Sequence, residues 1–177
     1  MVKKRGLENA SIFLPMNLKN KKVAILGWGV DTQDVAPWLE KQGAKIKILD
    51  ESKDDRFDKL DRFDLLVRSP GVYRYREEFE GLNITSKTKL FFDLCPAKII
   101  GVTGTKGKGT TATLIYEILK AAGKDVYLGG NIGEGVFQYL PKLTKNSWVV
   151  LELSSFQLID LDKSPHIAVV LMVTSEH

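Results

Sequence analysis

Short apolar runs recur along the first half of the chain and predict strands. Residues 22–29, KVAILGWG, are apolar and closed by glycines, which is typical of a buried parallel strand that enters a tight turn. Residues 45–50 alternate, and residues 63–68 form a third run that the SPG turn at 69–71 stops. A helical pattern over 32–42 lies between the first two runs. Strand, helix and strand in this order predict a parallel sheet with a right-handed crossover.

Proline shapes the helices of this half. Pro37 falls in the middle of 32–42, so the helix is expected either to start late or to kink. Residues 82–85 predict a short strand, and 87–94 predict a short helix that ends before Pro96.

The pattern of strand, glycine turn and helix then starts again. Residues 97–104, AKIIGVTG, predict a strand, and 110–123 predict a strong helix. Its apolar positions are expected to share one face: Leu114, Ile115, Ile118, Leu119 and Ala122. Two more strands are predicted at 147–153 and 166–173. The restart predicts an α/β protein with two domains, residues 1–95 and 96–177.

Composition and charge narrow the class of protein. Of 177 residues, 44% are hydrophobic and 27% charged, which is the balance of a soluble globular protein. The net charge of +4 comes without a run of Lys or Arg, so we expect no nucleic-acid partner. No apolar stretch has the length to span a membrane, and the patch at 11–16 is too short for a signal-peptide core. Cys95 is the only cysteine and is expected to be buried, which fits a reducing compartment and a cytoplasmic protein.

The first glycine loop, residues 27–32, begins like a dinucleotide-binding fingerprint. Thr32 stands where a third glycine is expected, and Asp50 lies at about the right distance downstream to meet a ribose hydroxyl. Asp31 would repel a diphosphate held against this loop. Two interpretations stay open: a ligand site, or the tight turn that any such sheet needs.

The second glycine loop, GVTGTKGKGTT at 101–111, is more informative. It lies between a predicted buried strand and a helix, where backbone N–H groups and the helix N-terminus can point at a phosphate. Lys108 supplies a mobile positive charge for the β- and γ-phosphates. The usual phosphate loop has glycine where Val102 stands and Ser or Thr where Gly109 stands. The loop therefore predicts a nucleotide site with altered spacing, against the alternative of a glycine-rich turn without a ligand.

This spelling resembles the ATP loop of the Mur ligases and of the related folylpolyglutamate synthases. The run from Gly107 to Thr110 is closer to the second branch, in which the hydroxyl comes one residue later. Two further stretches resemble the Mur ligases that add D-glutamate: GGNIG at 129–133 and LELSSFQL at 151–158. VTSEH at 173–177 resembles the family's strand-end segment that carries a metal-binding histidine. The SPG turn at 69–71 resembles the family's turn near the uracil nucleotide.

The resemblance implies a fold and a reaction. The fold would be a Rossmann-like UDP-sugar-binding domain, followed by the first part of a P-loop-type central ATPase domain. The reaction would be ATP-dependent amide formation in peptidoglycan synthesis. The carboxylate of UDP-N-acetylmuramoyl-L-alanine attacks the γ-phosphate of ATP, and the amine of D-glutamate captures the acyl phosphate.

The resemblance also implies site residues. ATP would be bound by Gly104, Thr105, Lys106, Gly107, Lys108, Gly109 and Thr110. Mg²⁺ would be held by Thr110, Glu152 and His177, and Lys108, Glu152 and His177 would be catalytic. The nucleotide-sugar substrate would contact Gly29, Asp50, Ser69, Pro70, Gly71 and Asn131. Asp31 and Thr32 depart from the family pattern, in which Ser or Thr and then Gly meet the diphosphate.

Other interpretations stay open. The chain could belong to another Mur ligase or to a folylpolyglutamate-type amide ligase, or it could be a noncatalytic nucleotide-binding module. The rest of the family's ATPase domain and its amino-acid-binding third domain have no counterpart here. We therefore expect the 177-residue chain to be an N-terminal piece that ligates nothing by itself. The oligomeric state stays open.

Overall fold

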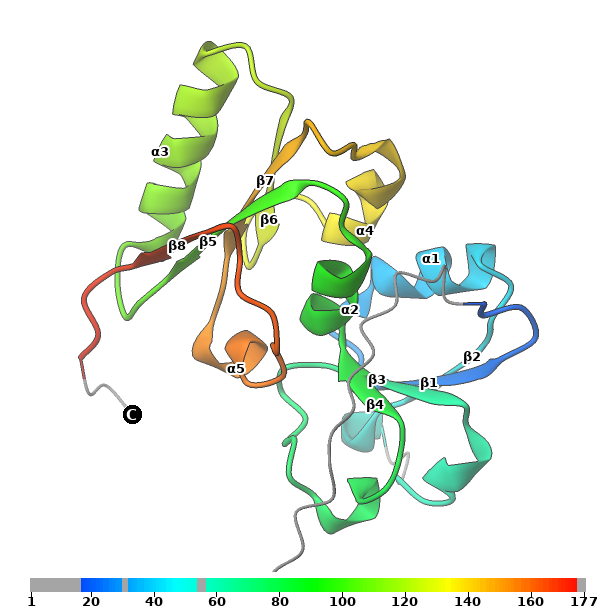
Figure 1. Ribbon diagram of the computed structural model, residues 1–177. Coiled ribbons are helices and arrows are strands. Elements are labelled where there is room, and N and C mark those ends of the chain that lie inside the picture. The colour runs from blue at the N-terminus through cyan, green and yellow to red at the C-terminus, as the bar shows by residue number, and fades with distance from the viewer. Residues whose placement is uncertain (1–16, 30–31, 54–56, 175–177) are drawn as a thin grey trace, which may run out of the picture.

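The computed structural model describes residues 17–29, 32–53 and 57–174 and contains two α/β units, each built on a four-stranded parallel sheet (Figure 1). The two units follow one another along the chain, as the restart of the sequence pattern predicts. We refer to them as the first unit, up to α2, and the second unit, from β5 onward. A division at residues 95 and 96 stays a prediction.

The first sheet has the strand order β2-β1-β3-β4. Its strands are β1 (Lys22–Leu26), β2 (Lys45–Leu49), β3 (Leu65–Arg68) and β4 (Ile84–Ser86), and all pairs are parallel. Its α-helices are α1 (Val35–Lys41) and α2 (Lys87–Leu94), with 3-10 turns η2 (Glu51–Lys53), η3 (Leu60–Arg62) and η4 (Glu77–Phe79).

The late start of α1 resolves the question that Pro37 raises. The helix begins at Val35 rather than at residue 32, which places Pro37 in the first turn. Backbone N–H groups in a first turn have no partner within the helix, so the missing N–H of proline costs little there.

The second sheet has the order β6-β7-β5-β8. Its strands are β5 (Lys98–Thr103), β6 (Val126–Gly130), β7 (Trp148–Glu152) and β8 (Ile167–Val170). Its helices are α3 (Lys108–Ala121), α4 (Val136–Tyr139) and α5 (Ser155–Leu158), with the 3-10 turn η5 (Leu140–Lys142). The sequence analysis missed β6, α4 and α5, of which β6 contains the first two glycines of GGNIG.

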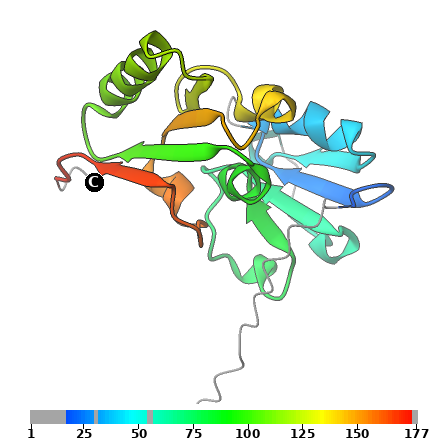
Figure 2. The same cartoon turned by 45° about the horizontal axis from the view of Figure 1, so that its top comes forward.

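Helix α3 lies on one face of the second sheet, away from the first unit (Figures 1 and 2). Ala112 is fully buried, and Ile115 and Leu119 pack against Val102 and Val150. The predicted apolar face is only partly correct. Leu114 and Ile118 are 59% and 58% exposed, because the buried stripe runs through positions 112, 115, 116 and 119.

The largest hydrophobic cluster belongs to both units. Side chains from β1, α1 and α2 pack with Val136, Phe137 and Tyr139 of α4. The rings of Trp38 and Phe137 lie 5.0 Å apart between centroids, and those of Phe91 and Phe137 lie 6.1 Å apart. The two sheets are therefore held by one shared core as well as by the chain that joins them.

Candidate active site

The second glycine loop, here residues 104–107, lies between the end of β5 and the start of α3, at the edge of the sheet where the parallel strands have their carboxyl ends. Gly107 caps α3 in the left-handed conformation, with a φ of 82°. Lys108 is the first residue of the helix, and its Nζ donates to the carbonyl oxygens of Gly104 and Thr105 at 2.9 and 3.0 Å. The ammonium group is therefore folded over the loop, beside the N–H groups that open the helix.

Glu152 is the last residue of β7 and pairs in register with Val102 of β5. Its side chain is buried, and its Oε2 lies 3.4 Å from the position that a Cβ would take at Gly109. The carboxylate thus faces the first turn of α3 at position 109. Thr110, the residue assigned to the metal from the resemblance, is exposed one position further along.

The glycines of GGNIG allow two backbones to meet at the end of β7. A Cβ at Gly130 would lie 2.1 Å from the carbonyl oxygen of Glu152, and the φ of Gly130 is 96°. The next backbone N–H, that of Asn131, donates to the same oxygen at 3.1 Å. The structure thereby brings Asn131 next to Glu152. Sequence reasoning recognised this stretch only by resemblance. Glycine is needed at position 130 because of the backbone of Glu152, which lies about 20 residues further along the chain.

The segment after β8 runs along the second glycine loop. The N–H of Thr105 donates to the carbonyl of Met172 at 3.0 Å, and the N–H of Thr174 donates to the Thr105 hydroxyl at 2.9 Å. His177, assigned to the metal by resemblance, lies outside the described residues.

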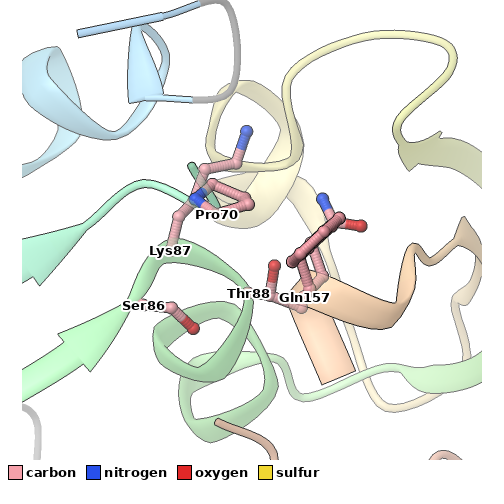
Figure 3. Close-up of a pocket in the computed structure, with 6 residues that line it drawn as sticks. Pro70, Ser86, Lys87, Thr88 and Gln157 are labelled. Atoms are coloured by element: carbon pink, nitrogen blue, oxygen red, sulfur yellow. The ribbon is translucent and has the colours of Figure 1, made fainter. Parts of the chain in front are cut away.

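The LELSSFQL stretch uses its polar residues as a helix cap. The Ser154 hydroxyl accepts a hydrogen bond from the N–H of Gln157, and the Gln157 side chain accepts one from the N–H of Ser154, which is a capping box at the start of α5. Gln157 is buried and lines a small cleft with Pro70 and with residues 86–88 at the start of α2 (Figure 3). This end of β7 is therefore placed directly against the first unit.

A second, wider cavity of about 410 Å³ lies at the ends of β1, β2 and β3 in the first unit. Its wall contains all five first-unit residues assigned to the substrate: Gly29, Asp50, Ser69, Pro70 and Gly71. Trp28, Glu51, Ser52 and Phe57 line it as well, and sequence reasoning missed them. Asn131 is not among its lining residues.

Asp50 is held firmly in the wall of this cavity. Its carboxylate accepts hydrogen bonds from the Ser52 hydroxyl at 2.8 Å, the Ser52 N–H at 3.1 Å and the Trp28 N–H at 3.3 Å. The hydrogen bond from the Ser52 side chain is the main cause that lowers the pKa of Asp50, against the opposing effect of desolvation. The cavity therefore contains an ionised carboxylate at neutral pH.

Thr32 secures the first glycine loop. Its side chain is fully buried, and its hydroxyl accepts from the N–H of Gly29 and lies 3.2 Å from the carbonyl oxygen of Gly27. Thr32 thus replaces a glycine with a hydroxyl that stabilises the turn. Asp31 lies outside the described residues.

His166 and Cys95 do not take part in either site. His166 is exposed, and its Nδ1 accepts a hydrogen bond from the N–H of Ile99 at 3.1 Å. Cys95 is a buried free thiol, as expected, and burial raises its pKa to about 11. A thiol with a raised pKa is a poor nucleophile.

Comparison with known proteins finds one family that the chain resembles. Residues 102–177 match the Mur ligase middle domain. The chain is 36% identical to a UDP-N-acetylmuramoylalanine–D-glutamate ligase of Clostridium botulinum (strain Hall), over 90% of this chain and 41% of the relative. It is 39% identical to the ligase of that name from Acetivibrio thermocellus, over 90% of this chain and 40% of the relative. The chain thus spans about two fifths of the length of these curated relatives, and it is similar to Mur ligases over most of its own length.

Proposed function

We propose that this chain, as a stretch of Mur ligase sequence, is part of an ATP-dependent enzyme that joins D-glutamate to UDP-N-acetylmuramoyl-L-alanine. The names of the curated relatives support this substrate pair. The observation that carries the proposal is that Lys108 and Glu152 both lie beside the first turn of α3, at one edge of the second sheet.

The proposed chemistry needs charge neutralisation more than covalent help. A carboxylate oxygen of the nucleotide-sugar substrate attacks the γ-phosphorus of ATP, and ADP leaves. The amine of D-glutamate then attacks the acyl carbon and loses a proton as phosphate leaves. Lys108 and the N–H groups at the start of α3 would neutralise charge on the phosphates during the first step.

The buried carboxylate of Glu152 fits a site for Mg²⁺, which prefers oxygen ligands and is usually shared with phosphates. Mg²⁺ bound there would neutralise charge on the β- and γ-phosphates. Thr110 and His177 are the other proposed ligands. Within the described ranges no three His, Cys, Asp or Glu residues form a metal-ligand cluster, so phosphate oxygens and waters would complete the coordination.

We assign the 410 Å³ cavity of the first unit to the uridine nucleotide, in a Rossmann-like domain. Gly29, Asp50 and the turn at 69–71 would contact it, and Asn131 would contact the sugar-peptide part of the substrate. In the part of the chain that the structure describes, no helix has the length and apolar character to cross a membrane. We propose a cytoplasmic enzyme, in keeping with a single, free cysteine.

Calorimetry on this chain tests the two nucleotide sites. We expect ADP with Mg²⁺ to bind at the loop and UDP to bind separately at the first-unit cavity. Lys108→Ala should weaken ADP by about 1.5–3 kcal/mol, as for the loss of a charged hydrogen-bond donor, and leave UDP unchanged. Lys120→Ala, at the other end of the same helix, is the matched control. Equal ADP affinity for Lys108→Ala and Lys120→Ala would contradict the loop assignment.

The choice of amino acid is tested separately. A phosphate-release assay on the complete gene product, with UDP-N-acetylmuramoyl-L-alanine and ATP, should respond to D-glutamate. Turnover with a folate acceptor, or with a different amino acid in preference to D-glutamate, would replace the proposed reaction by that of another branch of the superfamily.

A further inference from the structure

Arg68, at the end of β3, holds the turn that lines the first-unit cavity. Its side chain is 2% exposed. Its Nη1 donates to the carbonyl oxygen of Ser69 at 3.2 Å and to that of Val72 at 2.7 Å. Ser69 is the first residue of the SPG turn and Val72 follows its last, and both line the cavity. The guanidinium group therefore ties the two ends of the turn together.

The other side of the same guanidinium group reaches the second unit. Its Nη2 donates to Oδ2 of Asp160 at 2.6 Å, and Asp160 is 4% exposed. Asp160 follows α5, two residues after Leu158. A second arginine of the first unit, Arg74, meets Oδ1 of Asp160 through its Nε at 2.9 Å. The buried carboxylate of Asp160 thus forms ion pairs with two arginines, Arg68 and Arg74, which lie on either side of the cavity turn.

The orientation of Arg68 depends on this carboxylate. Its Nε has no hydrogen-bond partner among the described residues, so the bonds of Nη1 and Nη2 alone orient the group. Removing one partner of a buried ion pair leaves a charge that must reorient toward water. A guanidinium group that turns away from Asp160 also gives up the carbonyls of Ser69 and Val72, because its donors form one rigid plane.

We propose that Arg68 is a positioning residue of the first-unit cavity and that Asp160 of the second unit completes the arrangement. The first cavity then reaches full affinity for its nucleotide only when the second unit is docked against it. The choice of a uridine nucleotide as the ligand rests on the proposed function. The dependence on Asp160 rests on the contacts of Arg68 alone.

Asp160→Asn and Asp162→Asn form a matched pair for the test. Asp162 also joins the two units, through Lys89 of α2 at 2.7 Å, but it is 55% exposed and Lys89 is not among the residues that line the cavity. With UDP as the probe in calorimetry, Asp160→Asn should lose affinity on the order of tenfold, as for one charge-assisted hydrogen bond. Asp162→Asn should stay within about twofold, and both variants should bind ADP as the wild type does.

Arg68→Lys is the second variant, because a lysine keeps the charge opposite Asp160 but cannot bond both carbonyls. It should weaken UDP in the same direction as Asp160→Asn. If UDP affinity is the same in the wild type, Asp160→Asn and Arg68→Lys, the inference is overturned while the proposed function stands.

Hydrogen exchange decides the remaining cases. In the wild-type chain, UDP should slow exchange at the Val72 N–H, which bonds to Ser69, and also at the Leu161 N–H, which bonds to Leu158 in the second unit. Protection at Val72 without any change at Leu161 overturns the inference, even if both variants fail to fold. If UDP does not bind the wild type, the proposed function fails at this cavity. The positioning role of Arg68 is then tested without ligand. Exchange at the Val72 N–H should be faster in Asp160→Asn than in Asp162→Asn, and equal rates overturn the inference.

Discussion

Replacing Gly130 by alanine should disturb the meeting of β6 and β7 more than any ordinary glycine substitution. The added Cβ would lie 2.1 Å from the carbonyl oxygen of Glu152 and 2.8 Å from its nitrogen, and both are backbone atoms that cannot swing aside. The strand ends must therefore separate. That separation breaks the hydrogen bond from the Asn131 N–H to the Glu152 oxygen, which is 3.1 Å long in the native chain.

The magnitude follows from two contributions. An alanine held at a φ of 96° costs about 1–2 kcal/mol because of left-handed strain. The broken hydrogen bond and the displaced strand ends add at least about 1 kcal/mol. We expect Gly130→Ala to lower the free energy of unfolding by about 2–3 kcal/mol or more.

Gly123→Ala provides the control for strain alone. Gly123 also has a positive φ, 70°, but nothing lies within 4 Å of its added Cβ. Urea unfolding gives the free energy of unfolding of each variant, and the difference between the two values isolates the backbone clash. Gly123→Ala should be the more stable variant by at least about 1 kcal/mol. Equal free energies of unfolding would refute the argument that GGNIG has glycine because of the approach of β7.

Three further predictions follow from single contacts. Gly109→Ser should place a hydroxyl opposite the Glu152 carboxylate and tighten Mg²⁺-dependent ADP binding in calorimetry, whereas a loss caused by Thr110→Val without any gain from Gly109→Ser would favour Thr110 as the ligand. His166→Ala should lower the free energy of urea unfolding by about 1 kcal/mol, because the Ile99 N–H loses its partner, and an unchanged value would contradict that role. The neutral thiol of Cys95 should stabilise the fold at neutral pH, and this contribution should be lost as pH rises from about 8.5, its ordinary pKa, to about 11. Cys95→Ala should therefore unfold with a weaker pH dependence above pH 8.5 than the wild type, and identical slopes would contradict the burial of the thiol.

Much of the fold could be predicted from the sequence because its signals are local. Short apolar or alternating runs located seven strands of the two sheets, three of them closed by glycine or by Ser-Pro-Gly, and the helix over 87–94 has the predicted bounds. Strand β6 was missed because its residues, VYLGG, end in two glycines and are only partly buried. The glycines look like a loop in sequence, yet they pair with β7 as far as Glu152.

The candidate sites were predicted unevenly, for the same reason. The cavity wall contains all five first-unit residues assigned to the substrate, since each lies within three residues of the end of a strand in one parallel sheet. The fixed position of Asp50 depends on Ser52 and could be suspected from their spacing. The pairing of Arg68 with Asp160 could not, because the two residues lie 92 positions apart and no local pattern marks either of them.

The contacts between the units bear on how the two proposed nucleotide sites relate. Asp34, just before α1, accepts a hydrogen bond from the N–H of Phe137 in α4 at 3.0 Å, and Phe137 in turn packs on Trp38 and Phe91. On the other side of the interface, Arg68 reaches Asp160. Rotation of one unit against the other would therefore have to break a shared aromatic core and several hydrogen bonds and ion pairs that involve charged groups. Such an interface favours a fixed distance between the 410 Å³ cavity and the Lys108 loop, and a fixed distance suits a substrate whose nucleotide end and reacting carboxylate must be held at both places at once.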